Sequence, residues 1–223
     1  MREHKKVGKR KKVEKKEIPR EIAIKPMDRK IISFYKRIKG INSLGNGKIA
    51  VVDRAVREFA DRFSGSNLNY AGKIANAISK FKKITLKKNQ IEQYYAKRSA
   101  SEIIKSRIIY LLDKPIKKGR NIFRVEGCLE RSNAVAALLR ARQIPAYFVR
   151  IGTHSFVIAR INIDNVERFY RIDILEKAND IVEPISISDI AIMESVISTG
   201  GGRIGIDSGD IGIRSLADTE SAM

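Results

Sequence analysis

The residues of this chain best suited to chemistry are a thiol, an imidazole and a carboxylate. Cys128 is the only cysteine, and His154 is the only histidine outside the extreme N-terminus. Asp173 follows after a polar break at 162–165. Each of the three lies at the edge of a predicted element, and together they are the set that a base-activated cysteine nucleophile requires. Cys128, His154 and Asp173 are therefore the candidate catalytic residues.

The element that must position Cys128 is a predicted helix over 128–142. This segment lacks Pro and Gly and is rich in Ala, Leu and Arg. Glu130 in its first turn and Arg140 in its last match the helix dipole, and Pro145 lies just past its end. The free N–H groups and positive dipole end at the start of the helix favour a thiolate and can hold an oxyanion.

His154 and Asp173 are predicted to meet across a β-hairpin. Residues 154–161 and 166–173 are strand-like. If 162–165 form a four-residue loop, paired residue numbers sum to 327 and His154 faces Asp173. Directly opposed side chains share a face of the sheet with Cβ atoms roughly 5 Å apart, so Asp173 can orient the imidazole.

The same register places Arg160 opposite Glu167, and an ion pair between them supports it. A slip of one residue would put His154 and Asp173 on opposite faces. Taken singly, a lone cysteine is usually a small buried side chain, and an aspartate at a strand end is usually a turn former.

The residues around this set resemble the transglutaminase-like superfamily of papain-like cysteine enzymes. The resemblance is carried over about 100–175 by Gly127-Cys128, by Leu-Arg-Ala-Arg-Gln-Ile-Pro-Ala at 139–146, by a His before a strand and by an Asp after an aromatic residue. It implies an α+β fold with a papain/transglutaminase-like core, in which the Cys-bearing helix packs on a small antiparallel sheet, with a helical amino-terminal half. It also implies that Cys128 is the nucleophile, His154 the general base and acid, and Asp173 the orienting carboxylate.

The chain departs from the family pattern at three places. It contains no Trp, and Phe156 and Tyr170 stand near the positions where the family often has one. Gln143 replaces the usual Gly before Ile-Pro. The side chain that helps to hold the oxyanion in relatives has no identifiable counterpart here.

Four regions are predicted from composition and pattern: a basic disordered tail over 1–26, a helical region over 27–99, a transglutaminase-like catalytic core over 100–197 and a Gly-rich flexible tail over 198–223. The tail contains Gly-x-Gly-x-x-Gly, but no room follows it for the helix and strand of a dinucleotide fold. Before Cys128, apolar periodicity and capping residues predict helices, followed by a loop over 113–126. These helices cover 28–39, 49–63, 67–82, 86–97 and 100–112.

The net charge of +20 belongs to the amino half of the chain. Residues 1–120 hold 34 Lys/Arg and 11 Asp/Glu, whereas 121–223 hold 11 and 14. The basic tail over 1–26 can bind the phosphate backbone of a nucleic acid or another polyanion without sequence preference, or can simply be a solvated tail. No aromatic residues are interleaved in it, which argues against base stacking.

The sequence predicts a cytoplasmic protein. No apolar run reaches the roughly 18 residues of a membrane helix, and no apolar stretch of a secretory signal follows the charged N-terminus. A single cysteine excludes an internal disulfide and a multi-cysteine zinc site. No metal or organic cofactor is needed for the chemistry.

The predicted function is a cysteine-dependent amide-bond hydrolase that acts on a protein or peptide through a thioester intermediate. If the second nucleophile is an amine, the protein is instead a protein-glutamine acyltransferase. A second class is a non-catalytic nucleic-acid or ribosome-binding protein on a degenerate transglutaminase-like fold, in which the basic half of the chain is the functional part. The substrate and the oligomeric state are left open.

Overall fold

The computed structural model describes residues 36, 38–87, 90, 94, 97–112, 116–118, 121–123, 127–151, 154–174, 182–185, 189 and 202–209. Its helices with defined bounds are α2 (Arg54–Ala60), α3 (Asn67–Ser79), α5 (Ala100–Ser106) and α6 (Cys128–Ala141). Its strands are β1 (Lys82–Leu86), β2 (Ile108–Leu112), β3 (Ile116–Lys118), β4 (Asn121–Phe123), β5 (Ala146–Ile151), β6 (His154–Ile163), β7 (Val166–Ile172), β8 (Val182–Pro184) and β9 (Gly202–Gly205).

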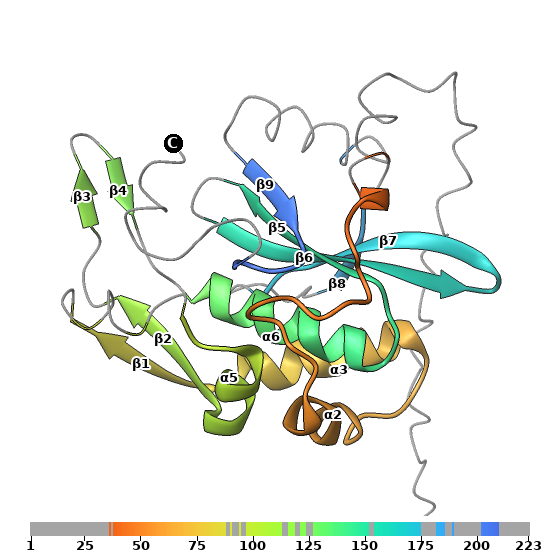
Figure 1. Ribbon diagram of the computed structural model, residues 1–223, viewed down its shortest axis with the longest axis horizontal. Coiled ribbons are helices and arrows are strands. Elements are labelled where there is room, and N and C mark those ends of the chain that lie inside the picture. The colour runs from red at the N-terminus through yellow and green to blue at the C-terminus, as the bar shows by residue number, and fades with distance from the viewer. Residues whose placement is uncertain are drawn as a thin grey trace, which may run out of the picture.

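The Cys-bearing helix α6 is the centre of the fold. One side packs on β5 and β6 of a five-stranded sheet with the order β8-β7-β6-β5-β9, in which all neighbours are antiparallel (Figure 1). The other side is covered by α2, α3 and α5. The predicted α+β fold, with the Cys-bearing helix on a small antiparallel sheet, is confirmed.

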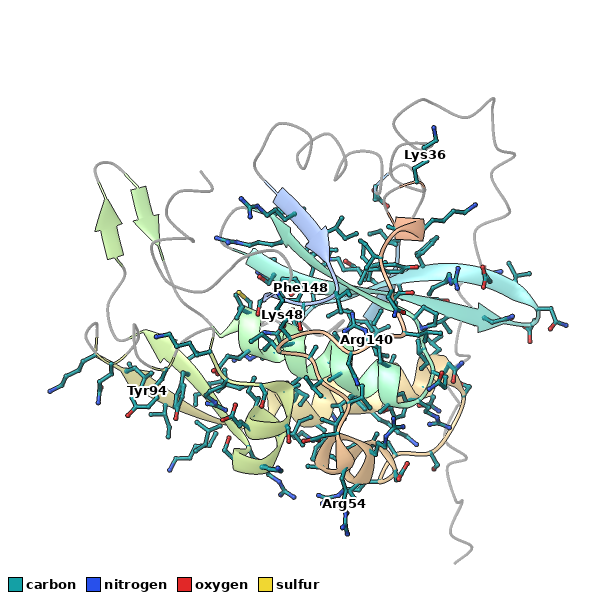
Figure 2. The ribbon with its side chains drawn as sticks, viewed as in Figure 1. Lys36, Lys48, Arg54, Tyr94, Arg140 and Phe148 are labelled. Atoms are coloured by element: carbon teal, nitrogen blue, oxygen red, sulfur yellow. The ribbon has the colours of Figure 1, made fainter. Side chains whose placement is uncertain are left out.

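Helix α6 is buried on all sides, including its polar residues. Glu130, Arg131, Asn133 and Arg140 are each at most 3% exposed. Buried charges are tolerated only when they are hydrogen-bonded. Arg140, which Figure 2 shows in the interior, donates to the carbonyl oxygens of Ser43 at 3.2 Å, Ala146 at 2.7 Å and Ile206 at 2.6 Å. These bonds tie α6 to segments far away in the sequence.

The carboxyl-terminal part of the chain differs from the prediction of a flexible tail. Residues 202–205 form β9, which pairs with β5, and a buried turn follows. Asp207 in this turn accepts hydrogen bonds from the backbone N–H groups of Ile49 at 2.6 Å and Ala50 at 2.8 Å. The prediction is wrong for 202–209, because the turn satisfies buried donors of the core. The rest of 198–223 lies outside the described residues.

Two predicted helices are shorter than expected. Helix α2 begins at Arg54 rather than at 49, because the side chain of Asp53 caps it by accepting the N–H of Val56. Helix α5 ends at Ser106, where Arg107 takes a left-handed conformation with φ 52°. The remainder of the predicted helix over 100–112 is strand β2, which runs parallel to β1.

Strand β2 stands where a helix was predicted because its run of five apolar residues fits a strand as well as a helix. Residues 82–86 form β1, where the ends of two predicted helices were expected to meet. Part of the predicted loop over 113–126 forms the antiparallel pair β3 and β4. The predicted tail over 1–26 and most of the predicted helices over 28–39 and 86–97 lie outside the described residues. The division into four regions stays a prediction.

Candidate active site

Gly127 sets the position of Cys128 at the start of α6. It is the N-cap residue with φ 72°, a conformation that residues with a side chain rarely adopt. A Cβ atom there would lie 2.3 Å from Cγ2 of the buried Ile109 in β2. Since glycine has no side chain, it cannot cap the first N–H groups of the helix. Cys128, the first helical residue, is 8% exposed, and its own N–H belongs to this set.

Replacement of Gly127 by alanine is expected to lower the free energy of unfolding by about 2–5 kcal/mol. The left-handed conformation costs roughly 1–2 kcal/mol for alanine, and overpacking against Ile109 costs about 1–3 kcal/mol. Urea denaturation measures the change. Gly72→Ala in α3 is the matched control, because a Cβ atom at Gly72 would have no atom within 4 Å and alanine favours a helix interior. A Gly127→Ala variant as stable as the wild type would contradict this account of the turn.

His154 and Asp173 are joined by a hydrogen bond, as the sequence predicts. His154 Nε2 lies 2.7 Å from Asp173 Oδ2. The carboxylate side chain is 8% exposed and the imidazole 32%. His154 begins β6, and Asp173 directly follows β7. The imidazole is therefore accessible at one side while its partner is buried.

The register that brings them together differs from the predicted one. Asp164 and Asn165 form a two-residue turn with φ 52° and 64°, so paired residue numbers sum to 329 rather than 327. Continuing this register by one residue places Asp173 opposite Phe156, which makes His154 its diagonal neighbour. The shift is two residues, so both side chains stay on the same face of the sheet.

The predicted pairing of Arg160 with Glu167 is corrected in the same way. Arg160 faces Phe169, and Asn162 faces Glu167. An ion pair still forms diagonally, with Arg160 Nε 3.6 Å from Glu167 Oε1. Diagonal neighbours on a sheet remain within reach of long side chains, so this pair is compatible with either register.

The imidazole of His154 also hydrogen-bonds the side chain of Cys128. Because Nε2 is bonded to Asp173, Nδ1 is the ring nitrogen left for the thiol. The hydrogen bond to Asp173, followed by the one to Cys128, raises the pKa of His154 to about 10 against the opposing effect of burial. Burial acts to raise the pKa of Asp173, but the hydrogen bonds and charges of His154 and Arg171 outweigh it and hold that pKa below its usual value. The structure thus brings together all three candidate residues.

Two buried charged residues in the first turn of α6 hold Cys128 in this place. Glu130 Oε2 accepts the backbone N–H of Tyr110 in β2 at 2.8 Å, and burial raises the pKa of Glu130 to about 7. Arg131 Nη1 donates to the carbonyl oxygen of Ile174 at 3.0 Å, next to Asp173. The start of α6 is therefore tied to β2 on one side and to the end of β7 on the other.

Sequence reasoning missed Arg131 and Arg171 as parts of the site. Arg171 in β7 donates to Oδ2 of Asp173, which directly follows the strand. Its position two residues before Asp173 was a usable signal, because side chains at this spacing share a face. Nothing in the local sequence marked the contact of Arg131 with Ile174, which depends on how α6 crosses the sheet.

Metal-binding and membrane-spanning features are absent from the described part of the chain. It contains no group of three or more His, Cys, Asp or Glu side chains that could hold a metal ion. In the same residues, no helix has the length and apolar character to span a membrane.

No protein-family model and no curated protein matches the sequence. Among solved structures, the chain is similar to one described as "a Putative Cysteine Protease from Cytophaga hutchinsonii", with 15% sequence identity and a TM-score of 0.43. The match covers 84% of this chain and 51% of that one, so the chain spans about half the length of that protein. The function proposed below rests on the residues of this chain.

Proposed function

We propose that the protein is a cysteine-dependent amide-bond hydrolase of the transglutaminase-like type, with Cys128, His154 and Asp173 as its catalytic triad. The observation that supports it most is the continuous hydrogen-bonded chain from the buried Asp173 through His154 to the thiol of Cys128. The thiol lies at the first residue of a 14-residue helix, where backbone N–H groups and the helix dipole favour negative charge.

In the first half of the reaction, the thiolate of Cys128 attacks the carbonyl carbon of a protein or peptide amide. The N–H of Cys128 and a second donor, not yet assigned, hold the oxyanion. The imidazolium of His154 gives its proton to the leaving nitrogen as the C–N bond breaks, which leaves a thioester. Because the pKa of His154 is raised to about 10, the imidazolium is populated at neutral pH.

In the second half, the neutral imidazole of His154 takes a proton from water, and the resulting hydroxide attacks the thioester carbonyl. The C–S bond breaks, the acid is released and the thiolate–imidazolium pair is restored. If an amine replaces water, the same steps give acyl transfer, as in a protein-glutamine acyltransferase. The proposed function is the hydrolytic branch, and acyl transfer is the alternative.

The other class of function is a nucleic-acid or ribosome-binding protein in which the triad is inert. Binding of a polyanion through the basic tail over 1–26 and a cytoplasmic location both stay predictions. The two classes are compatible in one molecule, since a hydrolase can be tethered to a polyanion by its tail. Salt-dependent binding of RNA that is unaffected by Cys128→Ala would measure the tail independently of the triad.

The experiment that tests the proposal is alkylation of Cys128 by iodoacetamide as a function of pH, in the wild type and in His154→Ala. In the wild type we expect fast alkylation to extend below the roughly pH 8.5 at which a free thiol ionises, because the imidazolium stabilises the thiolate. In His154→Ala the profile should move toward that of a free thiol. An unreactive Cys128 in the folded wild type, or identical profiles in the two proteins, would refute the catalytic proposal.

A further inference from the structure

Arg171 joins the buried carboxylate of the proposed triad to the edge of the sheet. Its Nη2 lies 2.5 Å from Asp173 Oδ2, the same oxygen that His154 Nε2 contacts at 2.7 Å. Its Nη1 lies 3.3 Å from Glu183 Oε1 on the neighbouring strand β8. The side chain of Asp173 is 8% exposed and that of Glu183 is 49% exposed, so one guanidinium connects an interior carboxylate with a surface one.

Phe156 supports both cationic groups that contact Asp173. The guanidinium carbon of Arg171 lies 4.8 Å from the centroid of the Phe156 ring, and the His154 ring stacks on Phe156 with centroids 6.0 Å apart. The side chains of all four residues lie on the same face of the sheet. His154 and Phe156 are two residues apart on β6, and Arg171 and Asp173 are two residues apart at the end of β7, a spacing at which side chains share a face. The packing fixes where the two cations can lie.

One oxygen of the Asp173 carboxylate, Oδ2, therefore contacts both cationic side chains. Oδ1 of this carboxylate is buried and has no hydrogen-bond partner among the residues that the structure describes. The charged and titratable groups around it are His154 on β6, Arg171 on β7, Glu183 on β8 beyond Arg171, and Arg131 and Cys128 on α6. Two cations at hydrogen-bond distance favour the ionised carboxylate over its protonated form.

We infer that Arg171 is a positioning residue of the proposed active site, which fixes the Asp173 carboxylate and keeps it ionised. A carboxylate already bonded to Arg171 is a weaker base, so the Nε2 proton of His154 stays on the ring, and the second proton of the imidazolium, on Nδ1, is the one that goes to the leaving nitrogen. The bond also selects Oδ2 as the oxygen presented to the ring and thereby orients Nδ1 toward Cys128. The inference rests on the proposed function, because it assigns Arg171 to the same reaction.

The competing role for Arg171 is structural. Its contact with Glu183 could serve only to hold the edge strand β8 against β7. Glu183→Gln removes that ion pair and leaves the contact with Asp173 in place. This variant is the matched control, since an edge brace and a positioning residue predict opposite results for it.

The test compares the wild type with Arg171→Gln, Arg171→Lys and Glu183→Gln by two measurements. The first is the rate of alkylation of Cys128 by iodoacetamide from about pH 5 to 9, and the second is the NMR titration of the His154 imidazole. Loss of the positive charge is expected to lower the alkylation rate near pH 5 by roughly three- to tenfold in Arg171→Gln, because the Asp173 carboxylate is held less firmly. It should move the His154 titration to higher pH, because a like charge next to the imidazolium is removed. Arg171→Lys keeps the charge without the planar fork and should restore part of the rate, while Glu183→Gln should stay within about twofold of the wild type.

Profiles of Arg171→Gln and Arg171→Lys that overlay the wild type, or a Glu183→Gln profile that reproduces Arg171→Gln, would overturn the inference. If Arg171→Gln does not fold, the Arg171→Lys and Glu183→Gln profiles decide between the two roles. A wild-type Cys128 that does not respond to His154→Ala is a separate result, which refutes the proposed function rather than the role of Arg171.

Discussion

Replacement of Cys128 by alanine is expected to reduce hydrolysis of an amide substrate by about 10⁴-fold or more, because no other group can form the thioester. The free energy of unfolding should change little, since only the sulfur atom is removed and the imidazolium of His154 keeps Asp173 as its partner. Turnover of a pool of fluorogenic peptide amides measures the first effect, and urea denaturation measures the second. The combination identifies Cys128 as the nucleophile rather than as a packing residue.

Cys128→Ser is the matched control for this prediction. It keeps a hydrogen-bonding group of similar shape next to His154 but offers a hydroxyl, which is a far weaker nucleophile at neutral pH. We expect it to be nearly as inactive as the alanine variant and to be insensitive to iodoacetamide. Undiminished hydrolysis by Cys128→Ala would show that the activity does not use this thiol.

The residues of the site could be predicted more accurately than the pairing register of β6 and β7, and the hairpin shows why. Only the alternation of faces had to be right for His154 and Asp173 to meet, and a shift of two residues preserves alternation. The loop length was wrong, because Asp164 and Asn165 both adopt positive φ and close the turn in two residues without the glycine that usually marks such turns. The ion pair of Arg160 with Glu167 could not correct it, since long side chains reach diagonally.

The helices around the site could be predicted where a helical sequence pattern ran over many residues and had typical flanking residues at its ends. Helix α6 was expected over 128–142 and spans Cys128–Ala141, because its composition and flanking residues agree. The run at 108–112 is apolar at every position, so its pattern does not distinguish strand β2 from the continuation of a helix. Arg107 ends α5 in a left-handed conformation without a glycine to announce it.

The parts that could not be predicted are those that depend on contacts distant in sequence. Asp207 is fully buried because it accepts N–H groups of Ile49 and Ala50, and a Gly-rich composition carries no sign of this. Arg131 is buried because the end of β7 presents the carbonyl oxygen of Ile174 to α6. Local pattern predicts which side chains face inward, whereas tertiary packing decides which polar groups they satisfy.

Replacement of Asp173 by alanine is expected to reduce hydrolysis mainly at alkaline pH, so the pH range of activity becomes narrower. The hydrogen bond to Asp173 is the largest cause of the raised pKa of His154, so its loss lowers that pKa from about 10 toward the ordinary value of 6.5. The imidazolium that protonates the leaving nitrogen is then lost at lower pH. At about pH 9 we expect hydrolysis by the variant to fall roughly 10- to 100-fold further below the wild type than at about pH 6.

Asp173→Asn separates the effect of the hydrogen bond on the pKa of His154 from the effect of the negative charge. An asparagine can present its carbonyl oxygen to His154 and Arg171 as the carboxylate does, but it carries no charge. We expect its alkaline limb to lie between those of the wild type and Asp173→Ala. If the pH profiles of hydrolysis for all three proteins share the same alkaline limb, the charge of Asp173 does not act on His154.

The free energy of unfolding should depend on pH through the same two groups, His154 and Asp173. A histidine whose pKa is raised in the folded state contributes stability that is fully present below pH 6.5 and is lost as the pH rises through about 10. An aspartate whose pKa is depressed contributes stability that is present above its ordinary pKa of 3.8 and is lost as the pH falls further. The difference in free energy of unfolding between the wild type and Asp173→Ala should therefore be largest between these two limits and should shrink toward pH 10. A difference that grows with pH in this range would mean that the imidazolium is not the partner of Asp173.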